Sequence, residues 1–421
     1  MSDATPAPPT SPDAERRERL RAKANRVFTP SLPVSQESVF AGRADQVREV
    51  LDAINRPGQH VLILGEPGVG KTSLANILSS RVATKTKQVV APRVNCERID
   101  DFSSIWRKVF ADVSVRHEKA RIGFSAEKNV ETRKVADTSP EEITTAYVLK
   151  TLRDLGKTTL VIVIIDEFDR IGDPDVRTAF ADTIKLLSDQ AVPATLVIVG
   201  VADTVDDLIE QHASIERALV QVRMPRMAPS ELQQIVLRGL HLLDLTIDPE
   251  ALVQIAALSQ GLPHYTHVLA LYAATAAIDE GATMVTAAHL SQAIRQAILR
   301  TQLSIASAYR KAIQARAGST RYVDALLGCA LAATDEHASF AVADVRAAFR
   351  EFSGSEAPVL LRILAELTRG SRGPALQRTG VRHAPRFRFA SPLMPPYVVM
   401  QAVAANRLAP ERLRGDGSDV V

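Results

Sequence analysis

The chain has 421 residues, of which 46% are hydrophobic and 24% are charged, and its formal net charge is +3. This length is enough for two or three domains with hydrophobic cores of their own. The two cysteines, Cys96 and Cys329, belong to no disulfide or metal motif, which argues against a disulfide scaffold or a zinc site and predicts two buried thiols. A net charge of +3 is too small to indicate a nucleic-acid partner, so local clusters must carry that argument.

Nothing in the sequence predicts a membrane protein. No run approaches the roughly 18 apolar residues of a membrane-spanning helix. The first residues, MSDATPAPPTSPDAE, lack the apolar core of a signal peptide. We therefore expect a cytoplasmic protein with no membrane partner.

The N-terminal region, residues 1–33, is expected to hold a disordered tail and one helix. Pro, Ala, Ser and Thr dominate residues 1–13, which cannot bury enough surface to become ordered. Residues 14–26 (AERRERLRAKANR) predict a basic helix. This helix is either a solvated arm or a contact for nucleic acid or a partner protein.

Residues 60–72 (HVLILGEPGVGKT) predict a phosphate-binding loop between a strand and a helix. The apolar run 61–64 favours a strand, residues 65–72 fit the pattern G-x-x-x-x-G-K-[ST], and the next residues have helical spacing. In such a loop backbone N–H groups surround the phosphates, the Lys71 ammonium neutralises their oxygens, and the Thr72 hydroxyl is placed to bind Mg²⁺. The flanking strand and helix argue against a chance glycine turn. The residues expected to bind the nucleotide are Glu66, Pro67, Gly68, Val69, Gly70, Lys71, Thr72 and Ser73.

A second apolar strand, residues 158–165 (TTLVIVII), delivers Asp166 and Glu167 at its carboxyl end. Open α/β sheets bind their ligands at that end of the strands. We expect Asp166 to bind Mg²⁺ through a water or through Thr72, and Glu167 to orient or deprotonate the attacking water. A Ras-like GTPase would need an Asn-Lys-x-Asp segment, which this sequence lacks, so ATP is the expected nucleotide.

Four further elements are expected between the P-loop helix and the Asp-Glu strand. Residues 114–138 are polar and charged without clear periodicity, which predicts an exposed insertion. The other three are a strand at residues 88–94, a helix at residues 102–113 with Trp106 in the core, and a helix at residues 140–155 that Ser139 caps.

The segment before the P-loop, residues 39–45 (VFAGRAD), resembles the segment that packs over the nucleotide base in AAA+ ATPases. It has the pattern F-x-G-R, then an acidic residue and an amphipathic helix, and it ends just before the P-loop strand. The resemblance implies that Val39 and Phe40 line the adenine pocket and that Gly42 and Arg43 shape the turn. Phe40 as an ordinary core residue is the alternative.

The strand at residues 194–200 (ATLVIVG) leads to Asp203. At this point AAA+ proteins carry a polar residue, often Asn, that contacts the γ-phosphate or the water. An ionised carboxylate accepts hydrogen bonds but would repel phosphate. By the resemblance Asp203 therefore orients water, pairs with a cation or caps the following helix.

Two more positions resemble phosphate contacts of AAA+ ATPases. Residues 214–219 (SIERAL) resemble the helix end that presents the arginine finger, which implies that Arg217 reaches the γ-phosphate bound by a neighbouring subunit. An intrachain salt bridge of Arg217 is the alternative. His264 stands where relatives carry a phosphate-contacting Arg. A neutral imidazole lacks that charge, so the contact is weak, pH-dependent or shared with His267, or His264 packs in the lid.

The C-terminal half predicts successive helices and then a winged-helix domain. Residues 229–297 fit several amphipathic helices, the expected lid of the ATPase core, and residues 301–316 fit a connector helix. From about residue 317 onward we expect three helices and a hairpin that turns through Gly380. The three helices are expected at residues 322–331, 342–349 and 358–367.

The winged-helix region carries more arginines than acids, and such an excess can follow a phosphate backbone. Its third helix is mostly apolar and offers few side chains for base edges. Contact with duplex DNA and docking of a protein therefore both stay open. The arginines are Arg346, Arg350, Arg362, Arg369, Arg372, Arg378, Arg382, Arg386 and Arg388.

The order of these motifs resembles that of AAA+ ATPases, and most of all the replication-initiator branch of origin-recognition and helicase-loader proteins. The resemblance covers roughly residues 34–403. It implies an α/β fold: a P-loop NTPase with a doubly wound parallel sheet, a helical lid and a C-terminal winged-helix domain. We expect the ATPase core at residues 34–227, the lid at 228–300, and the connector and winged helix at 301–421.

Two functional hypotheses follow from this resemblance. The first is a DNA-associated AAA+ ATPase, a homo-oligomer that couples Mg²⁺-dependent hydrolysis of ATP to ADP to its own assembly. The alternative is a signalling or defence ATPase similar to the STAND ATPases, whose winged helix locks the nucleotide and contacts a protein effector. Residues 389–393 (FASPL) resemble the strand that closes the winged helix in such switches and support the alternative.

Overall fold

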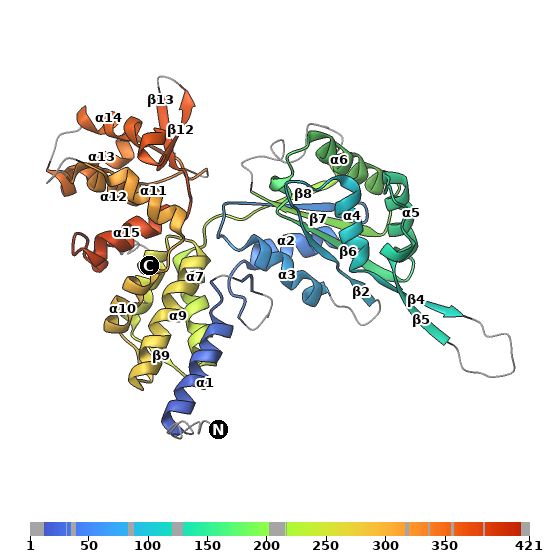
Figure 1. The fold of residues 1–421 in the computed structure, drawn as a ribbon, viewed down its shortest axis with the longest axis horizontal. Helices are drawn as coiled ribbons and strands as arrows, with labels where there is room; N and C mark the ends of the chain where they lie inside the picture. The colour runs from blue at the N-terminus through green and yellow to red at the C-terminus, as the bar shows by residue number, and fades with distance from the viewer. Residues whose placement is uncertain are drawn as a thin grey trace, which may run out of the picture.

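A parallel sheet of short apolar strands forms the centre of the nucleotide-binding half of the molecule (Figure 1). A computed structural model describes residues 12–30, 32–34, 39–82, 88–119, 129–201, 215, 217–315, 320–335, 337–354, 358–381 and 384–413. The strand order is β2-β6-β7-β1-β8, and β3 also pairs with β6. These strands are β1 (His60–Leu64), β2 (Gln88–Val90), β3 (Arg93–Asn95), β6 (Thr159–Asp166), β7 (Ala194–Gly200) and β8 (Leu219–Arg223).

Both faces of the sheet are covered by helices, so the strands are continuously apolar. Alternate residues of β1 point to opposite faces: Val61 and Ile63 belong to one hydrophobic cluster, and Leu62 and Leu64 to the other. The first face packs on α2 (Ala44–Ile54) and α3 (Lys71–Val82). The second packs on α4 (Phe102–Ala111), α5 (Thr145–Gly156) and α6 (Pro174–Asp189). The predicted doubly wound α/β sheet is therefore confirmed.

The strand expected at residues 88–94 is broken at Pro92. Proline has no N–H for a sheet hydrogen bond, and the chain forms β2 before it and β3 after it. The Pro92 carbonyl still accepts a hydrogen bond from Ile164 N at 2.9 Å. Arg93 and Asn95 therefore belong to a separate short strand that runs beside the end of β6.

Residues 114–155 hold the expected insertion, but the helix after it begins later than expected. The insertion contains an antiparallel hairpin, β4 (Ser114–Lys119) and β5 (Asn129–Lys134), that projects from the core (Figure 1). The helix expected from residue 140 begins at Thr145, because Thr144 rather than Ser139 accepts the capping hydrogen bond, from Tyr147 N. Ser139 Oγ instead donates to the Val135 carbonyl.

Four helices form the expected lid beside the sheet: α7 (Pro229–Leu242), α8 (Pro249–Ser259), α9 (Pro263–Glu280) and α10 (Ala287–Leu299). The predicted basic helix is present as α1 (Pro12–Val27), and it lies along α9 (Figure 1). Arg21 of α1 forms an ion pair with Asp279 of α9. Beyond α1, the ring of Phe28 packs edge-on against His267 of α9. The N-terminal segment is therefore attached to the lid.

The C-terminal region has the arrangement of a winged-helix domain. The strands form an antiparallel sheet in the order β11-β13-β12 beside three helices. A long apolar helix, α15 (Met394–Ala404), returns the chain to α10 and α12. The other elements are α11 (Leu303–Ile313), α12 (Arg321–Leu331), β11 (Phe340–Ala341), α13 (Val342–Ser353), α14 (Pro358–Leu367), β12 (Leu376–Val381) and β13 (Ala384–Phe389).

The predicted core residues are buried. Trp106 has no exposed surface and stacks on Phe180. Cys96 and Cys329 are free, buried thiols. Within the described residues, no helix has the length and apolar character that a bilayer crossing requires.

Candidate functional site

The P-loop connects β1 to α3 through glycines in the left-handed region. Gly68 and Gly70 have φ values of 86° and 95°, which other residues rarely adopt. This backbone brings residues 66–70 in front of the first turn of α3, where free N–H groups favour an anion. The loop thus has the shape that phosphate binding needs.

Lys71 is bound within its own loop. The residue is 9% exposed, and its ammonium donates to the carbonyl oxygens of Gly65, at 2.8 Å, and Glu66, at 2.9 Å. Burial lowers the pKa of Lys71 to about 8, while the carboxylates of Asp169, Asp166 and Glu66 act in the opposite direction. A phosphate would replace two neutral acceptors with a negative charge, which would stabilise the ammonium.

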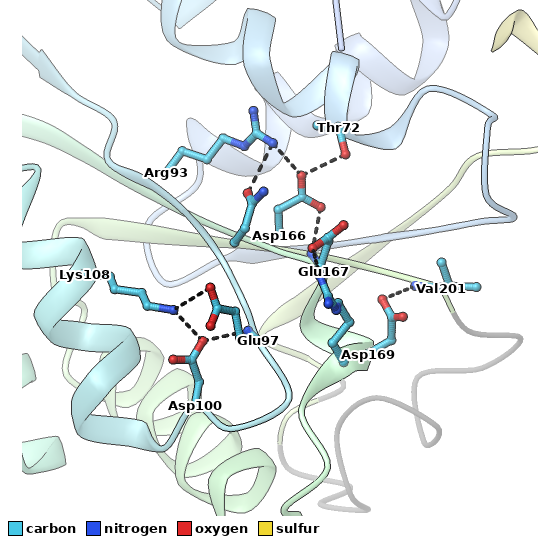
Figure 2. Close-up of polar contacts among 11 residues, drawn as sticks. Thr72, Arg93, Glu97, Asp100, Lys108, Asp166, Glu167, Asp169 and Val201 are labelled. Carbon is cyan, nitrogen blue, oxygen red and sulfur yellow. Dashed lines mark hydrogen bonds and ion pairs between the residues drawn. The ribbon is translucent and has the colours of Figure 1, made fainter. Parts of the chain in front are cut away.

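Asp166 and Thr72 meet at the carboxyl edge of the sheet (Figure 2). Thr72 Oγ1 donates to Asp166 Oδ2 at 2.8 Å, and the N–H of Glu167 donates to Asp166 Oδ1 at 2.8 Å. Hydroxyl and carboxylate oxygens are ligands that Mg²⁺ accepts. The described residues contain no group of three or more His, Cys, Asp or Glu that could hold a metal alone. The pair therefore fits an ion that takes its remaining ligands from water and phosphate.

Glu167 follows directly, and its carboxylate pairs with Arg170. It lies in the left-handed region with φ of 56°, and its Oε2 is 2.8 Å from Arg170 Nη1. Asp169, in the same turn, accepts a hydrogen bond from Val201 N at 2.8 Å, which fixes the end of β7 against this turn (Figure 2). Asp166 and Glu167, the two carboxylates expected to act on the nucleotide, are therefore adjacent, and Glu167 is paired with the Arg170 guanidinium.

A cavity of about 250 Å³ lies beside the P-loop. Segment 39–43, the lid and the N-terminal segment all line it, together with Gly68 to Ser73. Val39 and Phe40 are buried residues that line this cavity, and their contact with a base stays a prediction. The cavity opens onto the loop where phosphates would lie, so it is the candidate base pocket.

Arg43 and Gly42 do shape the turn before α2. Arg43 is 3% exposed, with φ of 62°, and its Nη2 donates to the carbonyls of Val69 at 3.0 Å and Pro225 at 2.5 Å. Burial lowers the pKa of Arg43 to about 10, and Glu231 opposes this shift. A Cβ on Gly42 would lie 2.5 Å from Met227. This turn ties the P-loop to the start of the lid.

His264 lines the cavity but is bound to the N-terminal segment. Its Nδ1 is 2.9 Å from the Pro30 carbonyl oxygen, so Nδ1 carries the hydrogen in this contact. Burial lowers the pKa of His264. Burial, and to a smaller extent His264, lower the pKa of His267 to about 4, and His267 Nδ1 has no partner among the described residues. Neither imidazole supplies the positive charge of the arginine that relatives carry here.

Of the two remaining predicted residues, Arg217 and Asp203, the structure describes only Arg217. Arg217 is exposed just before β8, and its carbonyl accepts a hydrogen bond from Gln59 Nε2 at 2.8 Å. Its neighbours Ser214 and Glu216 lie outside the described residues, and so does Asp203.

Two arginines of the site were missed from the sequence. Arg93 Nη2 lies 2.9 Å from Asp166 Oδ2, and Arg226 Nε lies 2.9 Å from Glu66 Oε2 (Figure 2 for Arg93). Neither belongs to the motifs that reveal a P-loop site. The only signal for Arg93 was its position two residues before Asn95, at the end of the strand next to Asp166.

Comparisons with known proteins agree with this geometry. Residues 39–199 match the family model of the AAA ATPase domain (AAA_16). A stretch of 92 residues is 36% identical to the Holliday junction branch migration complex subunit RuvB of Salinispora tropica. The match covers 20% of this chain and only 25% of that relative.

Solved structures are similar to this chain at low sequence identity. The Walker-type ATPase paby2304 of Pyrococcus abyssi has a TM-score of 0.51 at 15% identity, over 89% of this chain and 99% of that one. The Aeropyrum pernix ORC1 protein in complex with DNA has a TM-score of 0.46 at 14% identity, over 91% of this chain and 97% of that one. The matched family model includes the P-loop, the Asp166–Glu167 strand end and most of β7, so residues 39–199 of this chain form an AAA ATPase domain.

Proposed function

We propose that this protein is a Mg²⁺-dependent ATPase whose nucleotide state controls its assembly on DNA. The observation that carries the ATPase part is that Lys71, Thr72, Asp166 and Glu167 lie together at one edge of the sheet. The cavity beside them is the candidate site for the base. A triphosphate bound there would extend from the cavity along the P-loop to the two carboxylates.

In this proposal each residue exchanges a partner within the chain for one on the nucleotide. Lys71 leaves the carbonyls of Gly65 and Glu66 for phosphate oxygens. Thr72 and Asp166 hold Mg²⁺, which would neutralise charge on the phosphates. Glu167 leaves Arg170 and orients or deprotonates the attacking water. Since every group starts with a partner, ATP binding must outweigh the loss of these contacts.

The proposal that copies of the chain assemble rests on Arg217, whose side chain is exposed. An exposed arginine at the end of the core can reach a nucleotide bound by a neighbouring copy and stabilise the transition-state charge. Asp203 would then orient water at the end of β7. The proposed units are the core at residues 34–227, the lid at 228–300, and the connector and winged helix at 301–421.

DNA contact is proposed from the winged-helix arginines that remain exposed. Arg386 is paired with Asp335, and Arg372 lies over the ring of Tyr322 at 3.8 Å, so these two stabilise the domain itself. The exposed arginines on α13, on α14 and just after α14 are those available to phosphates. They are Arg346, Arg350, Arg362 and Arg369. Two proteins with a similar fold or segment are named for DNA transactions, RuvB and the DNA-bound ORC1, which motivates the test.

One observation favours the second candidate, a switch of the STAND type. Leu393, at the end of the winged helix, reaches the P-loop: its Cδ2 would lie 3.0 Å from a Cβ on Gly68. The Leu393 carbonyl accepts a hydrogen bond from Tyr265 of α9 at 2.7 Å. The C-terminal domain thus contacts the loop that binds phosphate, as a lock on the nucleotide would.

Two measurements test these proposals. Calorimetry with ATP and Mg²⁺ should detect binding to the folded protein, and the absence of binding would end both proposals. Titration of duplex DNA should then give an affinity that falls steeply with salt. Protein that binds ATP but no duplex at about 50 mM salt would favour the switch over the DNA-associated ATPase.

A further inference from the structure

Arg93 lies against Asp166, one of the two residues proposed to hold the metal. It lies on β3, which runs parallel to β6 with Asn95 opposite Asp166. Residues two apart on a strand share a face, so Arg93 and Asn95 lie on the α3 side while Val94 packs in the opposite core. The Arg93 side chain therefore points toward the first turns of α3 and the carboxylate of Asp166 (Figure 2).

Oxygen acceptors from three elements hold the guanidinium. Nη1 donates to Asn76 Oδ1 of α3, and Nη2 is 2.9 Å from Asp166 Oδ2 and 3.4 Å from Asn95 Oδ1. Asn76 lies one helical turn after Thr72, so the arginine bridges the P-loop helix and the Asp-Glu strand. The Arg93 side chain is 27% exposed and that of Asp166 is 3% exposed, which makes this a largely desolvated ion pair.

Counting the donors on Asp166 shows what this arrangement prevents. Oδ1 accepts from Glu167 N, and Oδ2 accepts from Thr72 Oγ1 and from Arg93 Nη2. Each carboxylate oxygen has two lone pairs, so Oδ2 is fully used. The Thr72 oxygen can bind a metal with its own lone pair while its O–H still donates to Asp166. Arg93 is then the donor that must leave before Oδ2 can accept a metal-bound water, which leaves one lone pair of Oδ1 as the only other acceptor site of this carboxylate.

We infer that Arg93 is a built-in counter-cation of Asp166, which neutralises the carboxylate in the metal-free site and competes with Mg²⁺ for Oδ2. This inference rests on the proposed function and adds to it a reason why the site stays closed to the metal until a nucleotide supplies further ligands. Because the hydrogen bonds of Arg93 described above go to Asp166, Asn95 and Asn76 and not to residues 65–72 of the P-loop, its effect should fall on the metal and not on the phosphates.

The test compares nucleotide affinity with and without the metal. A fluorescent methylanthraniloyl-ADP is titrated into the full chain, once with Mg²⁺ and once with EDTA. The dissociation constant in EDTA divided by that in Mg²⁺ reports how much the metal strengthens nucleotide binding. Arg93→Gln keeps a hydrogen-bonding amide but removes the charge. Mutating a partner that supports a metal ligand typically costs about 10- to 100-fold in metal affinity. Arg93 competes with the metal instead, so we expect the opposite sign, a rise of this ratio of about tenfold. The affinity in EDTA should stay within about twofold.

Two further variants make the result interpretable. Arg93→Lys restores the charge on a flexible stem without the fork, and should return the ratio most of the way to that of the parent. Arg170→Gln removes an equal charge beside Glu167 without touching Asp166, and serves as the charge-matched control. Its ratio should change by less than about twofold. Thermal unfolding of each nucleotide-free variant confirms that it folds.

Three outcomes would overturn the inference. In the first, the ratio is the same in Arg93→Gln and the parent. In the second, Arg93→Gln and Arg170→Gln change it equally, which would show an effect of net charge. In the third, the affinity in EDTA falls, which would place Arg93 on the phosphates. If the parent binds no nucleotide under either condition, the proposed function fails instead.

Discussion

Arg226 and Glu66 form an ion pair, with Arg226 Nε 2.9 Å from Glu66 Oε2, and this pair joins the P-loop to the lid. Arg226 lies between β8 and α7, and its Nη1 also donates to the Gln260 carbonyl at the end of α8. A movement of the P-loop on nucleotide binding would therefore shift Arg226, which lies just before the lid.

The coupling between these two residues should be measurable. Both side chains are about a quarter exposed, so we expect a double-mutant cycle with Glu66→Gln and Arg226→Gln to give a coupling free energy of about 1 kcal/mol in unfolding experiments. The exposed pair of Lys157 and Asp154 is the matched control and should give a value near zero. Equal coupling in the two pairs would mean that Arg226 is an ordinary surface contact.

Lys71 should make stability depend on pH. Burial lowers its pKa to about 8 from 10.5, so between these values the folded chain binds fewer protons than the unfolded chain. Stability then rises with pH through this window, and below pH 8 the buried charge costs up to about 3 kcal/mol. Lys71→Met should be more stable than the parent at pH 7, and the difference should shrink by pH 10. Urea unfolding at both pH values measures it, with Lys150→Met, at an exposed lysine, as the control. A difference independent of pH would contradict the assignment.

Lys71→Ala should lose ATP binding, whereas Glu167→Gln should lose only ATP hydrolysis. The first variant lacks the ammonium that neutralises the phosphates and should bind no ATP. The second keeps every phosphate contact but lacks the base that acts on water, so it should bind ATP and hydrolyse it about 100-fold more slowly. Glu141→Gln, at an exposed glutamate far from the P-loop, is the control. Equal hydrolysis in Glu167→Gln and the parent would exclude Glu167 as the catalytic carboxylate.

Arg217→Ala should slow turnover without weakening ATP binding. If Arg217 acts across a subunit boundary, mixing this variant with Lys71→Ala should recover part of the activity, because mixed interfaces pair an intact P-loop with an intact arginine. Arg56→Ala, at an exposed arginine in the loop before β1, should behave as the parent. A variant of Arg217 that binds no ATP would show that this residue stabilises its own subunit.

The sequence was informative where chemistry and backbone geometry coincide. Gly68, Gly70 and Lys71 are readable because few other residues would serve in that loop. Asp166 could be placed beside Thr72 because the carboxyl ends of parallel strands share one edge of the sheet with the P-loop. The structure bears out both positions. The roles of Glu167, Asp203 and Arg217 remain predictions.

The residues that were missed depend on tertiary contacts. The sequence predicted one strand over residues 88–94 and not the register of β3 against β6. Nothing therefore indicated that the Arg93 side chain lies against Asp166. His264 was aligned to a phosphate-contacting arginine, but the N-terminal segment packs on the lid and gives its imidazole the Pro30 carbonyl as partner. The β4–β5 hairpin lacks the alternation of apolar and polar residues that reveals a strand with one buried face. Each of these features is fixed by a partner distant in the sequence.

The contact between Leu393 and the P-loop distinguishes the two candidate functions. If the winged helix holds the nucleotide in place, Leu393→Ala should weaken its hold on the loop around Gly68 and speed release of the fluorescent ADP analogue about tenfold, which corresponds to about 1.4 kcal/mol of lost contact. Leu361→Ala, at a leucine of α14 that is 48% exposed, removes the same atoms without touching the P-loop and should leave release unchanged. Stopped-flow displacement with excess ADP measures both rates. Faster release in Leu393→Ala alone would favour the switch. A winged helix that only binds DNA is not expected to affect the rate of ADP release. Equal rates in the parent and both variants would leave Leu393 as a packing contact and remove the observation on which the second candidate rests.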